Sequence, residues 1–267
     1  MLSDAADSIA RDGKILILAY DHGLEHGPVD FEPNPETADP AAIFELGSHD
    51  AVTAVAVQKG IAEAYYPDYA DDVNLLLKMN GTSNLWMGEP DSPINCTPEY
   101  AKELGASAVG FTLYGGSNHE VEMAEEFREV QEGAREQDMG VVMWSYPRGQ
   151  GVKNDTAADT IAYATRLGLE LGADVTKVKY PGSMEAMAHA VEMAARSKVV
   201  MSGGSKTDDA AFLKMVEAAM DAGADGLAVG RNVFQRENPT EILDALEAVV
   251  FEGATTDEAL TLAGTAD

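Results

Sequence analysis

Short apolar runs alternate with longer, more polar segments along the whole of the 267-residue chain. Within each run the apolar side chains occupy consecutive positions, as they do in strands that are buried on both faces. We predict eight such strands, at residues 14–20, 51–57, 73–79, 106–113, 140–146, 173–180, 198–201 and 226–229. We assign helices to the segments between them, at residues 40–47, 61–66, 118–137, 155–171, 183–195, 208–223 and 239–251, with a further helix that Thr97 caps.

Eight strand–helix units in about 250 residues predict an α/β fold, a closed (β/α)₈ TIM barrel that forms a single domain over residues 1–267. A doubly wound open sheet is the alternative, although such a sheet normally contains fewer strands. We expect a short helix at about residues 3–11 and an acidic tail at about residues 252–267. The connection at residues 82–97 is long and rich in Gly, Pro, Ser and Asn, which is typical of a functional loop.

The chain is strongly acidic, with 46 acidic and 18 basic residues and a net charge of −28. A polyanion repels nucleic acid, so the composition argues against nucleic-acid binding. Because 45% of the residues are hydrophobic, we expect a folded chain rather than a disordered one. The acidic residues lie mostly on predicted helix surfaces, and we interpret them as a halophilic adaptation to high salt. The alternative is an acidic face for a basic partner.

Three further features concern the compartment. The sequence has no run of about 18 apolar residues, so no membrane span is expected. Residues 1–13 are acidic and polar, unlike a secretory signal. The lone cysteine, Cys96, fits a reducing compartment. Together these features predict a cytoplasmic protein.

Polar side chains gather where the predicted strands end. In a barrel of this type the carboxyl ends of the strands form one ring, and active sites lie there. The ring is predicted to contain Asp21, His22, Lys59, Lys78, Asn80, Tyr114, Trp144, Tyr146, Arg148, Lys177, Lys179, Ser202, Lys206 and Arg231.

Lys177 and Lys179 lie two positions apart on one predicted strand, so their side chains point to the same side. Two ammonium groups that face one interior are costly unless the site uses them. A lysine that is desolvated beside a second cation loses proton affinity, and only the neutral amine attacks a carbonyl. The pattern therefore predicts a nucleophilic lysine. The alternative is an exposed edge strand with two solvated lysines.

Two glycine-containing turns follow the seventh and eighth predicted strands, where barrels of this type usually bind phosphate. They contain Ser202, Gly203 and Gly204 in the first turn and Gly230 and Arg231 in the second. Glycines let backbone amides approach an anion closely, and the cations Arg231 and Lys206 add charge. The turns therefore predict a phosphate site; otherwise they are two ordinary tight turns.

A lysine that forms an imine with a sugar phosphate needs a partner that moves protons. Asp21 and Tyr146 end the first and fifth predicted strands and both reach the centre of the ring. The alternatives are a turn cap for the aspartate and a core aromatic for the tyrosine. We expect Trp144 to pack below Tyr146, and Arg148 to lie at the rim.

The histidines give no metal signature, because they lack paired ligand spacing with carboxylates. His22 and His26 are candidates for binding a second phosphate, or else they only form hydrogen bonds within their loop.

Five ordered motifs extend over about residues 8–250. They are AYDHGLEHGP at residues 19–28, WSYPRG at 144–149, KVKY at 177–180, MSGG at 201–204 and AVGRNV at 228–233. On these motifs the chain resembles the archaeal-type class I fructose-bisphosphate aldolases.

The resemblance implies a metal-independent, cofactor-free aldolase that forms a Schiff base with its sugar-phosphate substrate on Lys177, the first lysine of the paired motif. It implies that Tyr146 is the proton donor, that Asp21 belongs to the catalytic set, and that the glycine turns bind phosphate. It also implies a homo-oligomer, often a decamer in this family. Lys177 lies deeper than Lys179, and we expect Lys179 to lower the pKa of Lys177.

The sequence departs from the family pattern at Ser205, which stands before Lys206 where proline is expected. A sister group, the 2-amino-3,7-dideoxy-D-threo-hept-6-ulosonate synthases of aromatic amino acid biosynthesis, shares the barrel, the lysine and the tyrosine. The stretch at residues 21–28 resembles the aldolases more closely. A non-catalytic phosphosugar-binding barrel is a third possibility, but it would not need Lys177, Tyr146 and Asp21 together.

Overall fold

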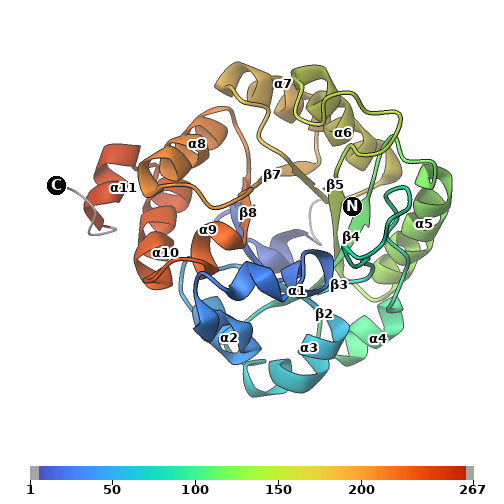
Figure 1. Cartoon of the computed structure of the whole chain (residues 1–267), viewed down its shortest axis with the longest axis horizontal. Coiled ribbons are helices and arrows are strands. Elements are labelled where there is room, and N and C mark those ends of the chain that lie inside the picture. Colours follow the sequence, from blue (N-terminus) through green and yellow to red (C-terminus); the bar gives the residue numbers. More distant parts are fainter. Residues whose placement is uncertain (1–5, 263–267) are drawn as a thin grey trace.

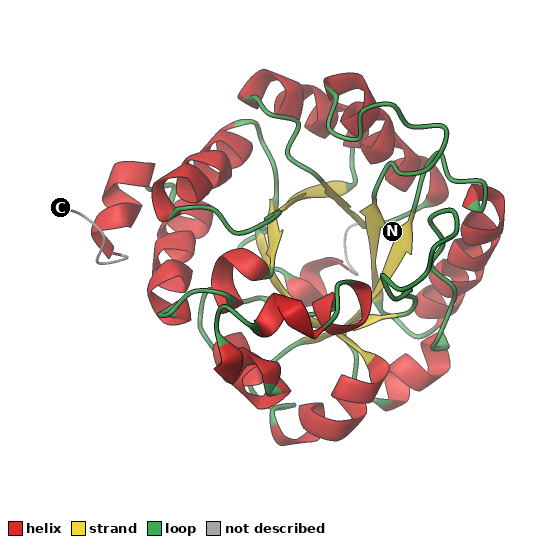
Figure 2. Cartoon of the chain, viewed as in Figure 1, coloured by secondary structure: helices red, strands yellow, loops and turns green. Residues whose placement is uncertain are grey.

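The computed structural model describes residues 6–262, in which eight parallel strands form a closed barrel with helices around it (Figures 1 and 2). Each strand pairs with the next along the chain, and β8 pairs with β1 to close the ring. This confirms the predicted (β/α)₈ barrel and excludes an open sheet. The strands are β1 (Ile15–Ala19), β2 (Ala54–Gln58), β3 (Leu75–Lys78), β4 (Ala108–Leu113), β5 (Gly140–Ser145), β6 (Val175–Val178), β7 (Lys198–Ser202) and β8 (Gly226–Val229).

The outer layer consists of one main helix after each strand. These helices are α2 (Pro40–Gly47), α3 (Lys59–Tyr65), α4 (Pro98–Glu103), α5 (Glu120–Glu136), α6 (Ala158–Leu171), α7 (Met184–Ala194), α8 (Asp209–Asp221) and α10 (Pro239–Glu247). None of the helices within residues 6–262 combines the length and the apolar composition that a membrane crossing requires.

Local signals set where these helices begin and end. Asp39, Thr97, Ser183 and Asp208 each accept a hydrogen bond from a backbone N–H in the first turn of a helix. Gly172 ends α6 with φ of 88°, a left-handed conformation that costs glycine little. The next residues then enter β6, so this turn aims that strand into the barrel.

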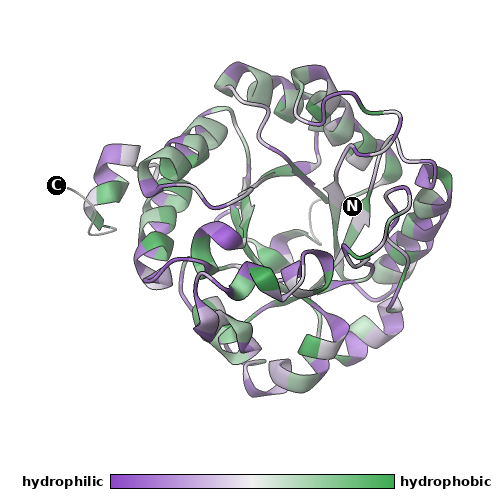
Figure 3. Ribbon diagram, in the orientation of Figure 1, coloured by the Kyte–Doolittle hydropathy of each residue, from purple (hydrophilic) through white to green (hydrophobic). Residues whose placement is uncertain are grey.

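Alternate residues of each strand point into the barrel. Outward-pointing residues such as Leu16 and Leu18 pack against the helices, and Figure 3 shows green, hydrophobic residues in the strands. The same alternation continues toward the carboxyl ends, where Lys78, Tyr146 and Lys177 follow inward-pointing residues at a spacing of two. The interior cluster contains Ala6, Ile9, Ile15, Ile17, Ala54, Ala56, Leu76, Ala108, Val142, Trp144, Val175, Val200 and Ala228.

Short elements occupy the loops and the two ends of the described chain. At the carboxyl ends of the strands, α1 follows β1 directly and α9 follows β8 directly. The short elements are η1 (Ala6–Ile9), α1 (His22–Glu25), η2 (Pro28–Phe31), η3 (Pro35–Ala38), η4 (Tyr66–Asp68), α9 (Arg231–Phe234), the π-helical η5 (Ala248–Glu252) and α11 (Thr256–Leu262).

The expectations for the two ends need correction. Of the helix expected at residues 3–11, the structure has the 3₁₀ helix η1, and residues 3–5 lie outside the described chain. The acidic tail expected at residues 252–267 is wrong for residues 256–262, which form α11. This helix packs against α8 and α10 (Figure 1) and buries Ala259, and its Thr256 N–H donates a hydrogen bond to Glu217 Oε2 of α8. Residues 263–267 lie outside the described chain.

The addition of one methyl group at Gly110 tests how closely the interior of the barrel is packed. A Cβ added at Gly110 would lie 2.5 Å from Trp144 Cζ3 and 2.8 Å from a methyl group of Leu76. We expect Gly110→Ala to lower the free energy of unfolding by about 1–3 kcal/mol, because two packed side chains must move. Urea denaturation measures this change.

The matched control is Gly60→Ala in α3, where an added Cβ meets no atom within 4 Å. This variant should be neutral or more stable by about 0.5–1 kcal/mol, since alanine restricts the unfolded chain. Equal effects of the two substitutions would contradict the described packing.

Candidate active site

A cavity of about 470 Å³ opens at the carboxyl ends of the strands. It brings together residues from β1, β5, β6, β7 and β8 and the loops that follow them. The lining includes the predicted site residues Asp21, His22, His26, Trp144, Tyr146, Arg148, Lys177, Lys179, Ser202, Gly203, Gly204, Gly230 and Arg231. The predicted ring also contained Lys59, Lys78, Asn80 and Tyr114, which do not line this cavity.

Among the residues predicted to bind substrate or phosphate, Lys206 is the one that does not line this cavity. Its ammonium group donates a hydrogen bond to the backbone oxygen of Gln235 at 2.7 Å, and it borders a separate, smaller pocket. The reason lies in the preceding turn, where Gly204 has φ of 69° and the side-chain amide of Asn232 holds the backbone oxygens of Gly203 and Ser205. This turn directs Lys206 away from the mouth.

Lys177 lies on the inner face of β6 with only 5% of its surface exposed. Its ammonium nitrogen is 4.7 Å from the centroid of the Trp144 ring and 6.0 Å from that of Tyr146. Burial lowers the pKa of Lys177 to about 8; the charges of Lys78 and Arg231 act in the same direction, while Asp21 and Glu25 oppose it. A substantial neutral fraction is therefore present near neutral pH.

Lys179 has a different environment from Lys177. Its ammonium forms an ion pair with Asp155, and about a quarter of the side chain is exposed at the rim of the cavity. The cations that lower the pKa of Lys177 are Lys78 and Arg231, so the role that we expected for Lys179 belongs to other residues.

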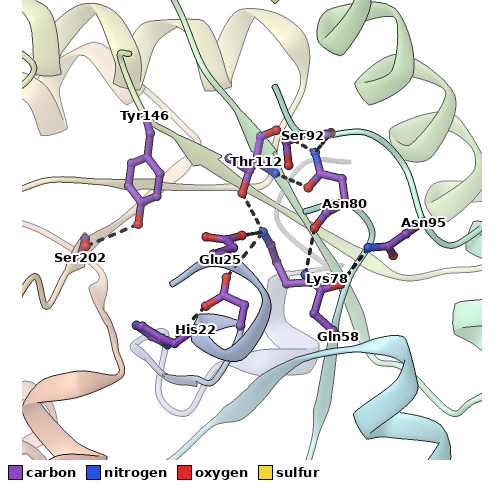
Figure 4. Close-up of polar contacts among 11 residues, drawn as sticks. His22, Glu25, Gln58, Lys78, Asn80, Ser92, Asn95, Thr112, Tyr146 and Ser202 are labelled. Carbon is purple, nitrogen blue, oxygen red and sulfur yellow. Dashed lines mark hydrogen bonds and ion pairs between the residues drawn. The ribbon is translucent and has the colours of Figure 1, made fainter. Parts of the chain in front are cut away.

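A buried polar network surrounds Lys78 (Figure 4). The ammonium of Lys78, on β3, donates hydrogen bonds to Glu25 Oε1 at 3.0 Å and Thr112 Oγ1 at 2.6 Å. It also lies 3.5 Å from Asp21 Oδ2. The network therefore joins the loop after β1 to strands β3 and β4.

Asp21 is buried directly after β1. Burial alone would raise its pKa, but the positive charges of Lys78 and Lys177 outweigh this effect and lower the pKa. Asp21 Oδ2 is buried and has no hydrogen-bond partner among residues 6–262. The carboxylate is thus ionised, and the contact that Oδ2 does make is the ion pair with Lys78 at 3.5 Å.

Tyr146 follows β5 and points toward Ser202 across the cavity, with 3.5 Å between the hydroxyl oxygens (Figure 4). Burial raises the pKa of Tyr146; the bond to Ser202 opposes this, and the negative charge of Asp21 adds to it. The phenol therefore keeps its proton at neutral pH and can donate it.

The loops after β7 and β8 form a tightly built corner. A Cβ on Gly230 would lie 2.3 Å from His22 Cε1 and 2.6 Å from the oxygen of Ala19, so only glycine fits there. The His22 ring also packs edge-on against Phe234 of α9, with centroids 5.1 Å apart. Burial lowers the pKa of His22 to about 4, so the imidazole is neutral at physiological pH.

Charged side chains surround this corner. Arg231 Nη1 lies 3.9 Å from Asp30 Oδ2, and the same oxygen lies 2.9 Å from His26 Nδ1. Arg231 Nε is buried without a hydrogen-bond partner among the described residues. Arg148 is exposed at the rim, where its guanidinium lies over the Tyr114 ring.

The sequence did not point to two residues that shape the site, Glu25 and Asn232. It placed Lys78 at a strand end but indicated no role for it. The spacing of two that selects Lys177 also selects Lys78, so a signal existed for that residue. Glu25 lies on the short helix α1, which no periodicity in the sequence predicts.

A group of possible metal ligands, His49, Asp244 and Glu247, lies outside the cavity lining. His49 Nδ1 accepts a hydrogen bond from Ala51 N–H, and its Nε2 faces Asp244 at 3.1 Å. Glu247 pairs with Arg11 at 2.8 Å. Protein partners therefore already satisfy these groups.

Comparisons with known proteins agree with this geometry. The family model for DeoC/LacD family aldolases matches residues 15–236. A curated relative from Halobacterium salinarum, fructose-bisphosphate aldolase class 1, is 71% identical over 94% of this chain and 96% of its own length. A second protein of that organism, 2-amino-3,7-dideoxy-D-threo-hept-6-ulosonate synthase, is 34% identical over 96% of this chain and 94% of its own length.

Among solved structures, an archaeal fructose-1,6-bisphosphate aldolase whose catalytic lysine is bound to the carbinolamine intermediate of its substrate has 47% identity. It superimposes with a TM-score of 0.90 over 94% of this chain and 99% of its own. On the family match, the relatives and the shared barrel, the chain belongs to the DeoC/LacD family of aldolases.

Proposed function

We propose that this protein is a class I fructose-bisphosphate aldolase, a lyase that reversibly cleaves fructose 1,6-bisphosphate into dihydroxyacetone phosphate and glyceraldehyde 3-phosphate in glycolysis and gluconeogenesis. The observation that carries the proposal is the buried amine of Lys177, with a pKa of about 8, beside Asp21 and Tyr146. With that pKa about a tenth of the amine is neutral at pH 7, against about 0.04% for an ordinary lysine. The relative with 71% identity supports the same substrate.

The reaction begins when the neutral amine of Lys177 attacks C2 of the substrate and forms a carbinolamine. Loss of water gives an iminium ion, which attracts electrons from the neighbouring bonds. The C3–C4 bond then breaks as the C4 hydroxyl loses its proton, so C4 leaves as the aldehyde and the electron pair forms an enamine. Protonation of C3 and hydrolysis of the iminium release dihydroxyacetone phosphate.

Asp21 and Tyr146 divide the proton transfers. The ionised carboxylate of Asp21 assists at the hydroxyl, and its place in the cavity lining supports this role. The phenol of Tyr146 delivers its proton to the nucleophilic carbon, and the phenolate so formed takes that proton back in the reverse direction; the raised pKa keeps the resting phenol protonated. The two groups therefore have opposite protonation states in one cavity, as acid–base catalysis requires.

The phosphate of the dihydroxyacetone half binds at the corner formed by the loops after β7 and β8. Ser202, Gly203, Gly204 and Gly230 line the cavity there, and Arg231 supplies the positive charge. Arg148, Lys179 and His26 lie nearer the rim and are candidates for the second phosphate. Trp144 forms the floor below Lys177.

Two alternatives are less well supported. The synthase relative has less than half the identity of the aldolase relative over a similar share of the chain. A non-catalytic phosphosugar sensor would have no use for the lowered pKa of Lys177 next to an ionised Asp21.

The proposed enzyme uses no metal or other cofactor, because the covalent imine supplies the electron sink that a metal would otherwise provide. We place it in the cytoplasm, and we attribute its net charge of −28 to life at high salt. Both statements rest on composition and on the Halobacterium relative.

We also propose a homo-oligomer, with a decamer as the state that the family resemblance favours. Leu85, Trp86 and Met87, on the loop after β3, are 84%, 56% and 93% exposed. Three consecutive large apolar side chains on an acidic surface are best covered by a second copy of the chain.

The first test is borohydride trapping with dihydroxyacetone phosphate, followed by peptide mass spectrometry. A triose-phosphate adduct is expected on Lys177, and Lys177→Met should lose the adduct and reduce kcat on the order of 10⁵-fold. The control is Lys179→Met, which changes the same residue type on the same segment and should keep the adduct on Lys177. An adduct on Lys179 would show that Lys179, and not Lys177, forms the imine. An active wild-type protein without any adduct would disprove the proposal.

Tyr146→Phe separates imine formation from proton transfer. The variant should still form the trapped adduct, because the amine remains, whereas proton exchange at C3 of dihydroxyacetone phosphate should slow about 10²–10⁴-fold. Tritium or deuterium exchange with solvent measures this step. Undiminished exchange would assign the proton transfer to another group.

A further inference from the structure

Lys78 has an environment that the proposed reaction does not explain. Its side chain is fully buried and does not line the cavity. A buried ammonium group is retained only when neighbouring groups compensate its charge. The groups around it therefore indicate what it does.

The partners of Lys78 come from α1, β4 and β5 and from residues next to them. Glu25 of α1 and Asp21 before it supply two carboxylates, at 3.0 and 3.5 Å. Thr112 of β4 accepts a hydrogen bond at 2.6 Å, and the centroid of the Trp144 ring of β5 lies 5.0 Å away. Tyr114, which follows β4, interacts with it electrostatically. One ammonium group therefore holds the two acidic residues that follow β1.

Lys78 and Lys177 share the same surroundings. The ammonium nitrogens lie 5.0 and 4.7 Å from the centroid of the same Trp144 ring. Both lysines interact with Asp21 and Glu25, and Arg231 is the further cation that faces Lys177. Tyr146 also lies near Lys177. The dry interior thus contains two carboxylates and a permanently charged lysine next to the lysine that must lose its proton.

We propose that Lys78 is a positioning residue of this site, whose buried ammonium fixes the carboxylates of Asp21 and Glu25 and favours the neutral form of the neighbouring amine of Lys177. The idea rests on the proposed function of Lys177 and extends it. Without Lys78, two buried carboxylates would face Lys177 alone and would stabilise its charged form.

Substitutions of Lys78 and of Glu25 should shift the pKa of Lys177 in opposite directions. Lys78 lowers the pKa of Lys177, whereas Glu25 raises it. Lys78→Gln should therefore shift the titration of Lys177 upward from about 8, on the order of one pH unit, and Glu25→Gln should shift it downward. At pH values below the pKa of Lys177, each unit by which that pKa rises reduces the neutral fraction of the amine tenfold. Imine formation falls by the same factor.

The experiment is competitive labelling of the full-length protein with trace acetic anhydride between pH 6 and 10, with Lys177 modification read by peptide mass spectrometry. This readout needs no substrate and no turnover. Lys78→Gln, Glu25→Gln and wild type are compared with Lys198→Met. Lys198 lies at the amino end of β7, pairs with Asp225, and should leave the titration unchanged.

Opposite shifts in the two variants would support the role of Lys78, because a merely structural lysine would not produce them. An unchanged inflection in Lys78→Gln, or shifts in the same direction, would overturn it. If circular dichroism shows that Lys78→Gln does not fold, the Glu25→Gln variant decides. A downward shift in the titration of Lys177 supports the arrangement, and an unchanged titration overturns it. Failure of the proposed function has a different signature, namely no trapped adduct on wild-type Lys177.

Discussion

The pairing of β8 with β1 is the constraint on which the rest of the structure depends. Once the sheet is closed, every strand has an inside and an outside, and the side chains alternate between them. Trp144 and Tyr146 therefore share the inner face with Lys177, although they come from a different strand. Without closure, the same residues would be distributed along an open sheet edge and would not surround one volume.

Closure also makes the interior dry, and this decides the charges within it. The amine of Lys177 and the phenol of Tyr146 both favour their neutral forms because they are buried. Asp21 stays ionised because nearby ammonium groups outweigh the same effect. One environment therefore raises the neutral fraction of a nucleophile, keeps an acid protonated and keeps a base charged, and differences in their neighbours account for the three outcomes.

Much of this arrangement was predictable from the sequence, because strands have a simple period. Eight apolar runs predicted the barrel, and positions two apart predicted which ends converge, including Lys177 and Tyr146. The orientation of Lys206 was not predictable, because it depends on the hydrogen bonds of Asn232 to a neighbouring loop. The helix α11 was missed because its stability comes from contact with α8 and α10 rather than from its own short, acidic sequence.

The short helix η1 determines by which end of the barrel substrate and products enter and leave. Ala6 and Ile9 are buried with the interior residues of β1 at the amino ends of the strands. Their side chains close this end of the barrel. Everything that enters or leaves must then use the opposite mouth. The water expelled when the imine forms exits past the same rim that admits the sugar, and the aldehyde product must depart before the triose bound behind it is freed.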